Sequence, residues 1–185
     1  MCIRDSDRQI TADVKLFYEK ITGLINYAFN PVDAYVYFDN FDDAIIRGIE
    51  TQLTLRPSQQ SRIHVAYAHT DISATANVQE SFYSIAAPEH SLSILGIWDF
   101  ANDVTGSVGF YQKSGHKLLA RRFLDPLESE PSLRVDARLA KKGKFAGHDQ
   151  EVALVLQNIF DETQDSRLRN FQGRRFYISY KLDLN

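Results

Sequence analysis

The sequence of 185 residues contains one cysteine, Cys2, which excludes an intramolecular disulfide and any metal site built from several thiolates. It has no stretch near the roughly 18 uninterrupted apolar residues that a membrane-spanning helix needs. Its 21 basic and 24 acidic residues give a net charge of −3 without a dominant basic patch, so no nucleic-acid partner is expected. Two classes stay open: a soluble domain, or a membrane protein built from strands, half of whose residues face water.

Motifs for catalysis and for metal binding are also missing. No Gly-x-Ser-x-Gly occurs, and the glycines of residues 106–117 (GSVGFYQKSGHK) lack the spacing of a phosphate-binding loop. We therefore expect neither enzymatic activity nor a cofactor. His69 and Asp71 lie two residues apart, but no third ligand is evident near them, so no metal site is expected.

The first six residues, MCIRDS, differ in character from the rest of the chain. Their back-translation resembles the end of a widely used transposon sequencing adapter, so we interpret residues 1–6 as non-native and the chain as truncated at its start. An ordinary N-terminal tail is the alternative. If the residues come from an adapter, Cys2 has no biological meaning, and the missing signal peptide carries no information about secretion.

The dominant pattern is an alternation of hydrophobic and polar residues with a period of two, which is typical of strands with one apolar face. It is clearest in the closing segment RRFYISYKLDLN, residues 174–185. One face carries Phe176, Ile178, Tyr180, Leu182 and Leu184, and the other carries Tyr177, Ser179, Lys181 and Asp183. The pattern predicts about eight strands, at residues 9–25, 34–56, 61–70, 89–100, 104–113, 131–142, 150–159 and 173–184.

The links between the predicted strands alternate in length. RPSQQS after the second strand and residues 101–104 are short, whereas residues 71–88 and 114–130 are long. The link KGKFAGHD is intermediate, and residues 161–170 are again longer. The best helix candidate, residues 117–128, is limited by Pro126. Short turns at one end and long loops at the other are the plan of an outer-membrane barrel.

Two interpretations of the apolar face compete: the core of a soluble all-β domain, or the lipid-facing wall of a membrane barrel. Polar residues on the other face suit both. The apolar faces span four or five successive positions, as a barrel strand of roughly 9–11 residues requires. Aromatic residues also gather near strand ends, where a barrel has interfacial girdles. They are Tyr18, Tyr35, Tyr37, Phe38, Trp98, Phe100, Phe176 and Tyr177. The predicted fold is an all-β, antiparallel, up-and-down transmembrane β-barrel segment of about eight strands, open or partial.

Several motifs in order resemble the C-terminal part of the barrel of TonB-dependent outer-membrane receptors. Asn40, Ala44 and the Gly-Ile-Glu of residues 48–50 match one strand element of that family. Residues 157–161, QNIFD, followed by Arg174 and Arg175, match the entry into its last strand. No single motif is specific, but their order and spacing cover nearly the whole chain after residue 7, so residues 7–185 resemble a part of that barrel.

The resemblance implies a complete fold of 22 strands around a plug domain, in the outer membrane of a Gram-negative bacterium. It implies energy-coupled uptake of a scarce nutrient such as a ferric siderophore, with outer-membrane lipid and the TonB complex as partners. The small-molecule ligand would be a compound such as a metal chelate. The sequence departs from the family in ending Leu-Asn rather than in an aromatic residue. From the resemblance, we also expect the plug and most of the first half of the barrel to be missing from it. We expect the isolated chain to be unstable and not to transport.

Candidate site residues fall into two groups. Phe82, Tyr83 and His116 lie in the long links and are expected to contact ligand if those links face outside. Glu50, Arg134, Asp136 and Arg138 are expected to face the lumen or the plug. The alternatives are complementary ion pairs between neighbouring strands for the charged residues of 134–138, and a bend that Gly48 permits in the case of Glu50. Two other functions stay open: a complete small eight-stranded outer-membrane protein with a structural or adhesive role, and a soluble all-β binding domain.

Overall fold

The computed structural model describes residues 9–74, 87–118, 127–161 and 173–184, and these residues form strands and turns. The prediction of eight long strands is confirmed. They are β1 (Ile10–Asn30), β2 (Tyr35–Ser58), β3 (Ser61–Ala74), β4 (His90–Phe100), β5 (Val104–Lys113), β8 (Ser132–Phe145), β9 (His148–Gln157) and β10 (Arg175–Leu182). No helix in this part of the chain is long and apolar enough to cross a membrane.

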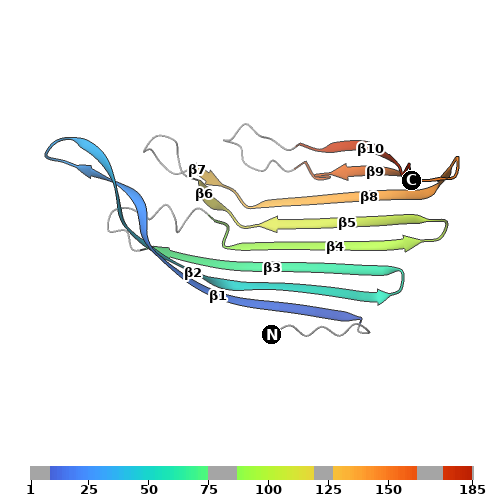
Figure 1. Ribbon diagram of the computed structural model, residues 1–185, viewed down its shortest axis with the longest axis horizontal. Helices are drawn as coiled ribbons and strands as arrows, with labels where there is room; N and C mark the ends of the chain where they lie inside the picture. The colour runs from blue at the N-terminus through green and yellow to red at the C-terminus, as the bar shows by residue number, and fades with distance from the viewer. Residues whose placement is uncertain (1–8, 75–86, 119–126, 162–172, 185) are drawn as a thin grey trace.

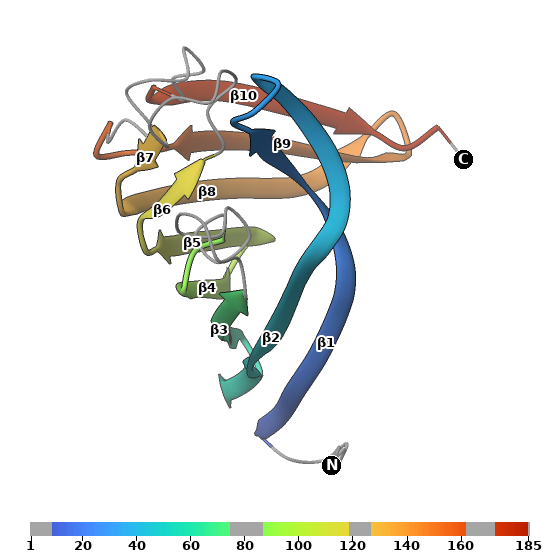
Figure 2. The same ribbon diagram turned by 90° about the vertical axis from the view of Figure 1, so that its left-hand side faces the viewer.

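The eight strands form one antiparallel sheet in the order β1-β2-β3-β4-β5-β8-β9-β10, so each long strand pairs with its neighbour in the chain (Figure 1). The sheet is curved, with β1 and β10 at its two edges (Figure 2). Because these edge strands do not pair with each other, the barrel is open, as the sequence predicted. Two short strands, β6 (His116–Leu118) and β7 (Leu127–Ser129), form a separate hairpin between β5 and β8.

The connections confirm the alternation in length and correct two details. Short turns at residues 59–60, 101–103 and 146–147 lie at one end of the sheet, and β3, β5 and β9 end at the other (Figure 1). The link KGKFAGHD was predicted to be intermediate, but β8 and β9 pair up to Phe145 and His148. Ala146 and Gly147 alone make that turn, with φ of 51° and 86°, the backbone signature of a tight hairpin.

The helix candidate at residues 117–128 is the second correction. Lys117 and Leu118 belong to β6, while Leu127 and Glu128 belong to β7. Residues 119–126 between them lie outside the described residues. The ends of this segment therefore pair as antiparallel strands, with His116 opposite Ser129 and Leu118 opposite Leu127.

The pairing register of the strands gives the sheet two chemically different faces. One row of paired residues is Val65, Ile94, Phe110 and Val135. The adjacent row is Ala66, Ser93, Tyr111 and Arg134. Because side chains alternate along each strand, the two rows point to opposite sides. We call these sides the apolar face and the polar face.

The burial of the two faces is opposite to that of a soluble sheet protein, which buries its apolar face. The fully buried hydrophobic residues of the described part lie on the polar face, and they are Ala44, Ala140, Ala153 and Val155. Large residues of the apolar face are exposed, for example Leu16 at 76% and Ile178 at 63%. The exposed apolar surface continues over β8 and β9 through Leu139, Val152 and Leu154, so this face lacks a protein partner among the described residues.

Trp98 lies on the apolar face, three residues before the short turn at 101–103. Its indole ring covers Gly96, where a Cβ atom would stand 2.3 Å from Trp98 Cη2. Trp98 as a whole is 37% exposed, so it packs against the sheet and still faces outward. This position suits the girdle role expected of Trp98 near a membrane interface.

Candidate functional site

A groove of about 720 Å³ runs over the polar face of β2, β3, β4, β5 and β8. Its floor consists of small side chains at paired positions of β3 and β4: Ala66 opposite Ser93, and Ala68 opposite Ser91. Longer side chains rise at its two sides: Glu50 and Gln52 on β2, and Tyr111, Lys113 and Arg134 on β5 and β8. The groove exists because two neighbouring strands carry only alanine and serine at the positions that point into it.

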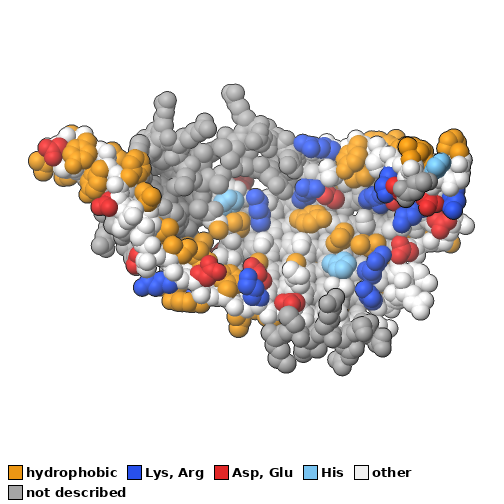
Figure 3. Space-filling view, in the orientation of Figure 1, with side chains coloured by type: hydrophobic (Ala, Val, Ile, Leu, Met, Phe, Trp, Pro, Cys, Tyr) orange, Lys and Arg blue, Asp and Glu red, His pale blue; other side chains and the backbone are white. Residues whose placement is uncertain are grey.

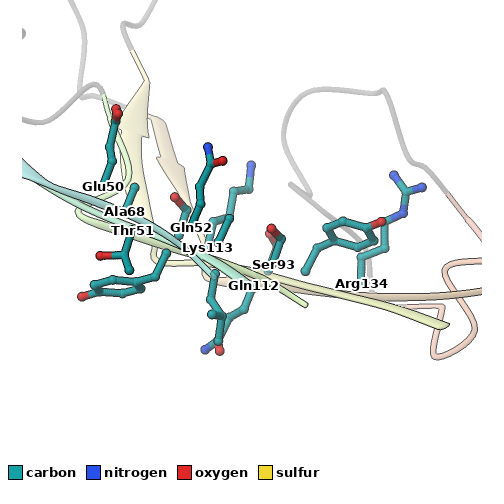
Figure 4. A pocket seen from close by; sticks show the side chains of 14 residues that line it. Glu50, Thr51, Gln52, Ala68, Ser93, Gln112, Lys113 and Arg134 are labelled. Carbon is teal, nitrogen blue, oxygen red and sulfur yellow. The ribbon is translucent and has the colours of Figure 1, made fainter. Parts of the chain in front are cut away.

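Figure 4 shows how the alternation builds this groove. Glu50, Gln52, Ser93, Lys113 and Arg134 lie on one side of the sheet. Thr51 and Gln112, their sequence neighbours, lie on the other. Figure 3 views the polar face, on which basic and acidic side chains lie side by side over the strands. The walls of the groove are therefore polar and charged.

Asp136 on β8 accepts three hydrogen bonds on this face. Arg134 Nε donates to Asp136 Oδ1 at 2.8 Å, and a second bond joins Arg134 Nη2 to Asp136 Oδ2. The backbone N–H of Asn158 also donates to Asp136 Oδ1, at 3.0 Å. The guanidinium carbon of Arg134 lies 5.6 Å from the centre of the Tyr111 ring. Asp136 thus fixes both the Arg134 side chain and the chain just after β9.

The other predicted lumen residues are paired more simply. Arg138 Nη2 donates to Glu151 Oε1 on β9. Glu50 lies 3.2 Å from Lys15 Nζ on β1, with both side chains well exposed, so screening by water makes that pair weak. All four residues lie on the polar face. The pair of Arg138 and Glu151 joins neighbouring strands, as in the alternative that the sequence offered for residues 134–138, whereas Arg134 and Asp136 pair within β8.

Lys113 differs from these charges. It borders the groove, and within the described part of the chain it has no hydrogen-bond or ion-pair partner. Its place in the groove was not predicted from the sequence, nor were those of Gln52, Ser91, Ser93 and Tyr111. The small residues at alternating positions of β3 and β4 were the available signal, but their meaning depends on which strands are neighbours.

Of the predicted ligand contacts, His116 is the one that the structure describes, and it does not line the groove. His116 begins β6, opposite Ser129 of β7, beyond the end of β5 and outside the groove lining. Phe82 and Tyr83 lie outside the described residues. Their expected role therefore stays a prediction.

Removal of the Asp136 carboxylate should destabilise this part of the sheet. We expect Asp136→Ala to lower the free energy of unfolding by about 1–3 kcal/mol, because it removes the acceptor of both Arg134 and the Asn158 N–H. Asp149→Ala is the matched control, since Asp149 is 73% exposed and 3.8 Å from Lys144, and it should change stability by less than about 0.5 kcal/mol. Urea unfolding in one detergent measures both. Equal losses in the two variants would contradict the assigned role of Asp136.

Comparisons by sequence and by structure give different results. No protein-family model and no curated protein matches the sequence. The structure resembles the pyoverdine outer-membrane receptor FpvA of Pseudomonas aeruginosa PAO1, with a TM-score of 0.72 and 15% identity over 95% of this chain and 27% of that receptor. It also resembles the ferric-catecholate import receptor Fiu of Escherichia coli K12, with a TM-score of 0.71 and 14% identity over 95% of this chain and 25% of Fiu.

A third solved structure agrees with these two. The ferric preacinetobactin receptor BauA of Acinetobacter baumannii matches with a TM-score of 0.70 and 15% identity, over 94% of this chain and 27% of BauA. The chain thus spans about a quarter of the length of each receptor. These matches confirm, at the level of fold, the resemblance to TonB-dependent receptors noted from the sequence. The sheet has the fold of a portion of these receptors.

Proposed function

We propose that the chain forms part of the barrel wall of a TonB-dependent outer-membrane receptor that takes up a scarce nutrient such as a ferric siderophore. One observation carries the proposal: the apolar face stays exposed across the sheet, while the fully buried hydrophobic residues lie on the polar face. Monomeric soluble proteins rarely expose a continuous apolar surface of this extent. Lipid is the natural partner for it, and the outer membrane of a Gram-negative bacterium is the proposed location.

The polar face then lines the lumen. Its charges are mostly neutralised in pairs, whereas Lys113 at the groove edge has no ion-pair partner among the described residues. An ammonium group beside a floor of small residues suits carboxylates or other anionic groups. These belong either to a plug domain or to an anionic metal chelate passing through. Glu50, Arg134, Asp136 and Arg138 border this space, while Phe82, Tyr83 and His116 would contact ligand from the long-link end.

The names of the structural neighbours support the ligand class. They are receptors for a ferric catecholate, for ferric preacinetobactin and for pyoverdine. Transport itself requires the plug and the TonB complex, which couples uptake to energy. The eight strands supply the lumen surface and the start of the extracellular links, and we expect no transport from these strands alone.

The proposal is tested with the complete gene that contains this sequence, obtained by long-read sequencing upstream of Asp7. We expect it to encode further alternating strands preceded by a plug-like domain. A signal peptide ending just before residue 7 would instead support a small self-contained barrel.

The complete gene is then expressed in an iron-limited host that lacks its own receptors, with ferric citrate, a ferric catecholate or ferric pyoverdine supplied. We expect growth on at least one of them, and none in a host without TonB. Growth that does not depend on TonB would overturn the proposed mechanism. A product that stays soluble without detergent would favour the soluble all-β domain.

A further inference from the structure

Three side chains that commonly bind metals meet at the long-link end of β3 and β4. His69 of β3 stands directly opposite His90 of β4, and Glu89 immediately precedes β4. The two imidazole rings are stacked, with centroids 4.7 Å apart and planes at 22°. One ligand atom from each of the three residues lies within 4.8 Å of the other two. The register of two strands thus brings together residues that are about twenty positions apart in sequence.

The imidazole nitrogen atoms of this cluster lie near one carboxylate oxygen, where they could bind a cation. His69 Nδ1 is buried and has no hydrogen-bond partner, and it lies 4.0 Å from Glu89 Oε1. His90 Nε2 lies 3.7 Å from the same carboxylate oxygen. A buried imidazole nitrogen without a partner is unfavourable, and a metal ion between these three atoms would satisfy it.

Tyr67 completes the arrangement from the same face of β3. Its hydroxyl group lies 2.9 Å from His90 Nδ1, which leaves Nε2 as the nitrogen that points to Glu89. A hydrogen bond to one imidazole nitrogen fixes the ring and the tautomer, so that the other nitrogen can bind a metal. The backbone is also held, because Thr70 N donates to Glu89 O at 2.9 Å and His90 N donates to Ser114 Oγ at 3.0 Å.

Asp71, the residue that the sequence paired with His69, takes no part. Arg47 on β2 holds its carboxylate through Nε at 2.7 Å and Nη2 at 2.6 Å. No metal site was expected from the sequence, for want of a third ligand near His69. Glu89 and His90 supply two further candidate ligands, from the far side of a long link.

We propose that His69, Glu89 and His90 bind a divalent transition-metal ion of the zinc class. Two imidazoles and one carboxylate are a ligand set that Zn²⁺ accepts, with water in the fourth position. Ligands of a tetrahedral zinc ion lie about 3.3–3.5 Å apart, so separations of up to 4.8 Å must shorten by up to about 1.5 Å. The Glu89 side chain is 64% exposed, so its carboxylate can move toward the two imidazole nitrogens, which lie 4.0 and 3.7 Å from it.

The site lies on the apolar face of β3, where His69 is the next residue after Tyr67 on that face. The groove lies on the polar face, on the other side of the sheet. A metal ion at the site would connect the start of β4 to β3, close to the end of β3 at Ala74. Metal binding there does not depend on nutrient uptake. It requires only that β3 and β4 pair in this register.

In the test, the product of the complete gene is purified in detergent and titrated with Zn²⁺ alone. A fluorescent zinc indicator that competes for the ion measures the affinity. Co²⁺ absorption in the visible range reports the geometry of the bound ion. We expect His69→Asn and His90→Asn to weaken the binding of one zinc ion by more than about tenfold. His64→Asn is the matched control, because His64 hydrogen-bonds Thr54 on the polar face, and its binding should equal that of the unmodified protein.

Tyr67→Phe separates metal binding from folding, because it removes no ligand. We expect it to weaken zinc binding by about 10–100-fold, with the sheet content unchanged by circular dichroism. Equal zinc affinity in the unmodified protein, His69→Asn and His90→Asn would overturn the site. The same conclusion would follow if the two variants lost zinc only in proportion to lost sheet structure while Tyr67→Phe bound normally.

Discussion

Ile94→Arg should lower the free energy of unfolding in lipid vesicles by about 2–4 kcal/mol. Ile94 lies in the middle of β4 on the apolar face, paired with Val65 on one side and Phe110 on the other. An arginine there would place its charge against acyl chains. Reversible urea unfolding of the complete protein in phospholipid vesicles, followed by circular dichroism, measures the change.

Ser93→Arg is the control for this prediction, because Ser93 is the adjacent residue and lies in the polar groove. We expect it to cost less than about 1 kcal/mol, since a lumen position accepts a charged side chain in water. Equal costs at the two neighbouring positions would contradict the assignment of the faces.

Gly48→Ala should be the most damaging small substitution in the sheet. A Cβ atom at Gly48 would stand 2.1 Å from the carbonyl oxygen of His69 and 2.7 Å from Phe17 Cζ. The carbonyl belongs to the β2–β3 ladder, where Gly48 pairs with Thr70, so it cannot move without disturbing that pairing. We expect a loss of about 1–3 kcal/mol or more in unfolding free energy.

Gly143→Ala provides the same chemical change at a tolerant position of β8. The nearest atom to its Cβ would be Gln150 Nε2, at 3.7 Å, an ordinary van der Waals contact. We expect its effect to stay within about 0.5 kcal/mol. The comparison uses urea midpoints under identical conditions. If Gly48→Ala matched Gly143→Ala, the close approach of β2 to β3 at this point would be wrong.

The strands and their faces were predictable because alternation is a local signal. Each long strand was located from its own residues, and the exposure of Leu16 and Ile178 agrees with the face assigned to them. Strand ends were less predictable. β8 continues through Lys141, Lys142 and Lys144 to Phe145, a polar stretch that resembles a loop in composition but pairs with β9.

The features that depend on neighbouring strands were not predictable. The groove requires Ala66 and Ala68 to lie beside Ser93 and Ser91, and no single strand shows this. The cluster of His69, Glu89 and His90 depends on a register set across a long link. Arg134 and Asp136 were visible in the sequence as opposite charges on one face of a strand. The pairing expected there was between neighbouring strands, whereas these two residues pair within β8.

The most direct test of the central claim is to measure which face of β10 meets lipid. Any native cysteine of the complete protein is first replaced by serine. Single cysteines are then placed in turn from Phe176 to Lys181, where every side chain is exposed and a spin label can be attached without disturbing a packed core. The complete protein is reconstituted in phospholipid vesicles, and collisions with oxygen and with a water-soluble nickel chelate are recorded. We expect oxygen accessibility to peak at Phe176, Ile178 and Tyr180, and nickel accessibility at Tyr177, Ser179 and Lys181. High nickel accessibility at all six positions, or protection of the apolar positions from both reagents, would contradict a lipid-facing wall.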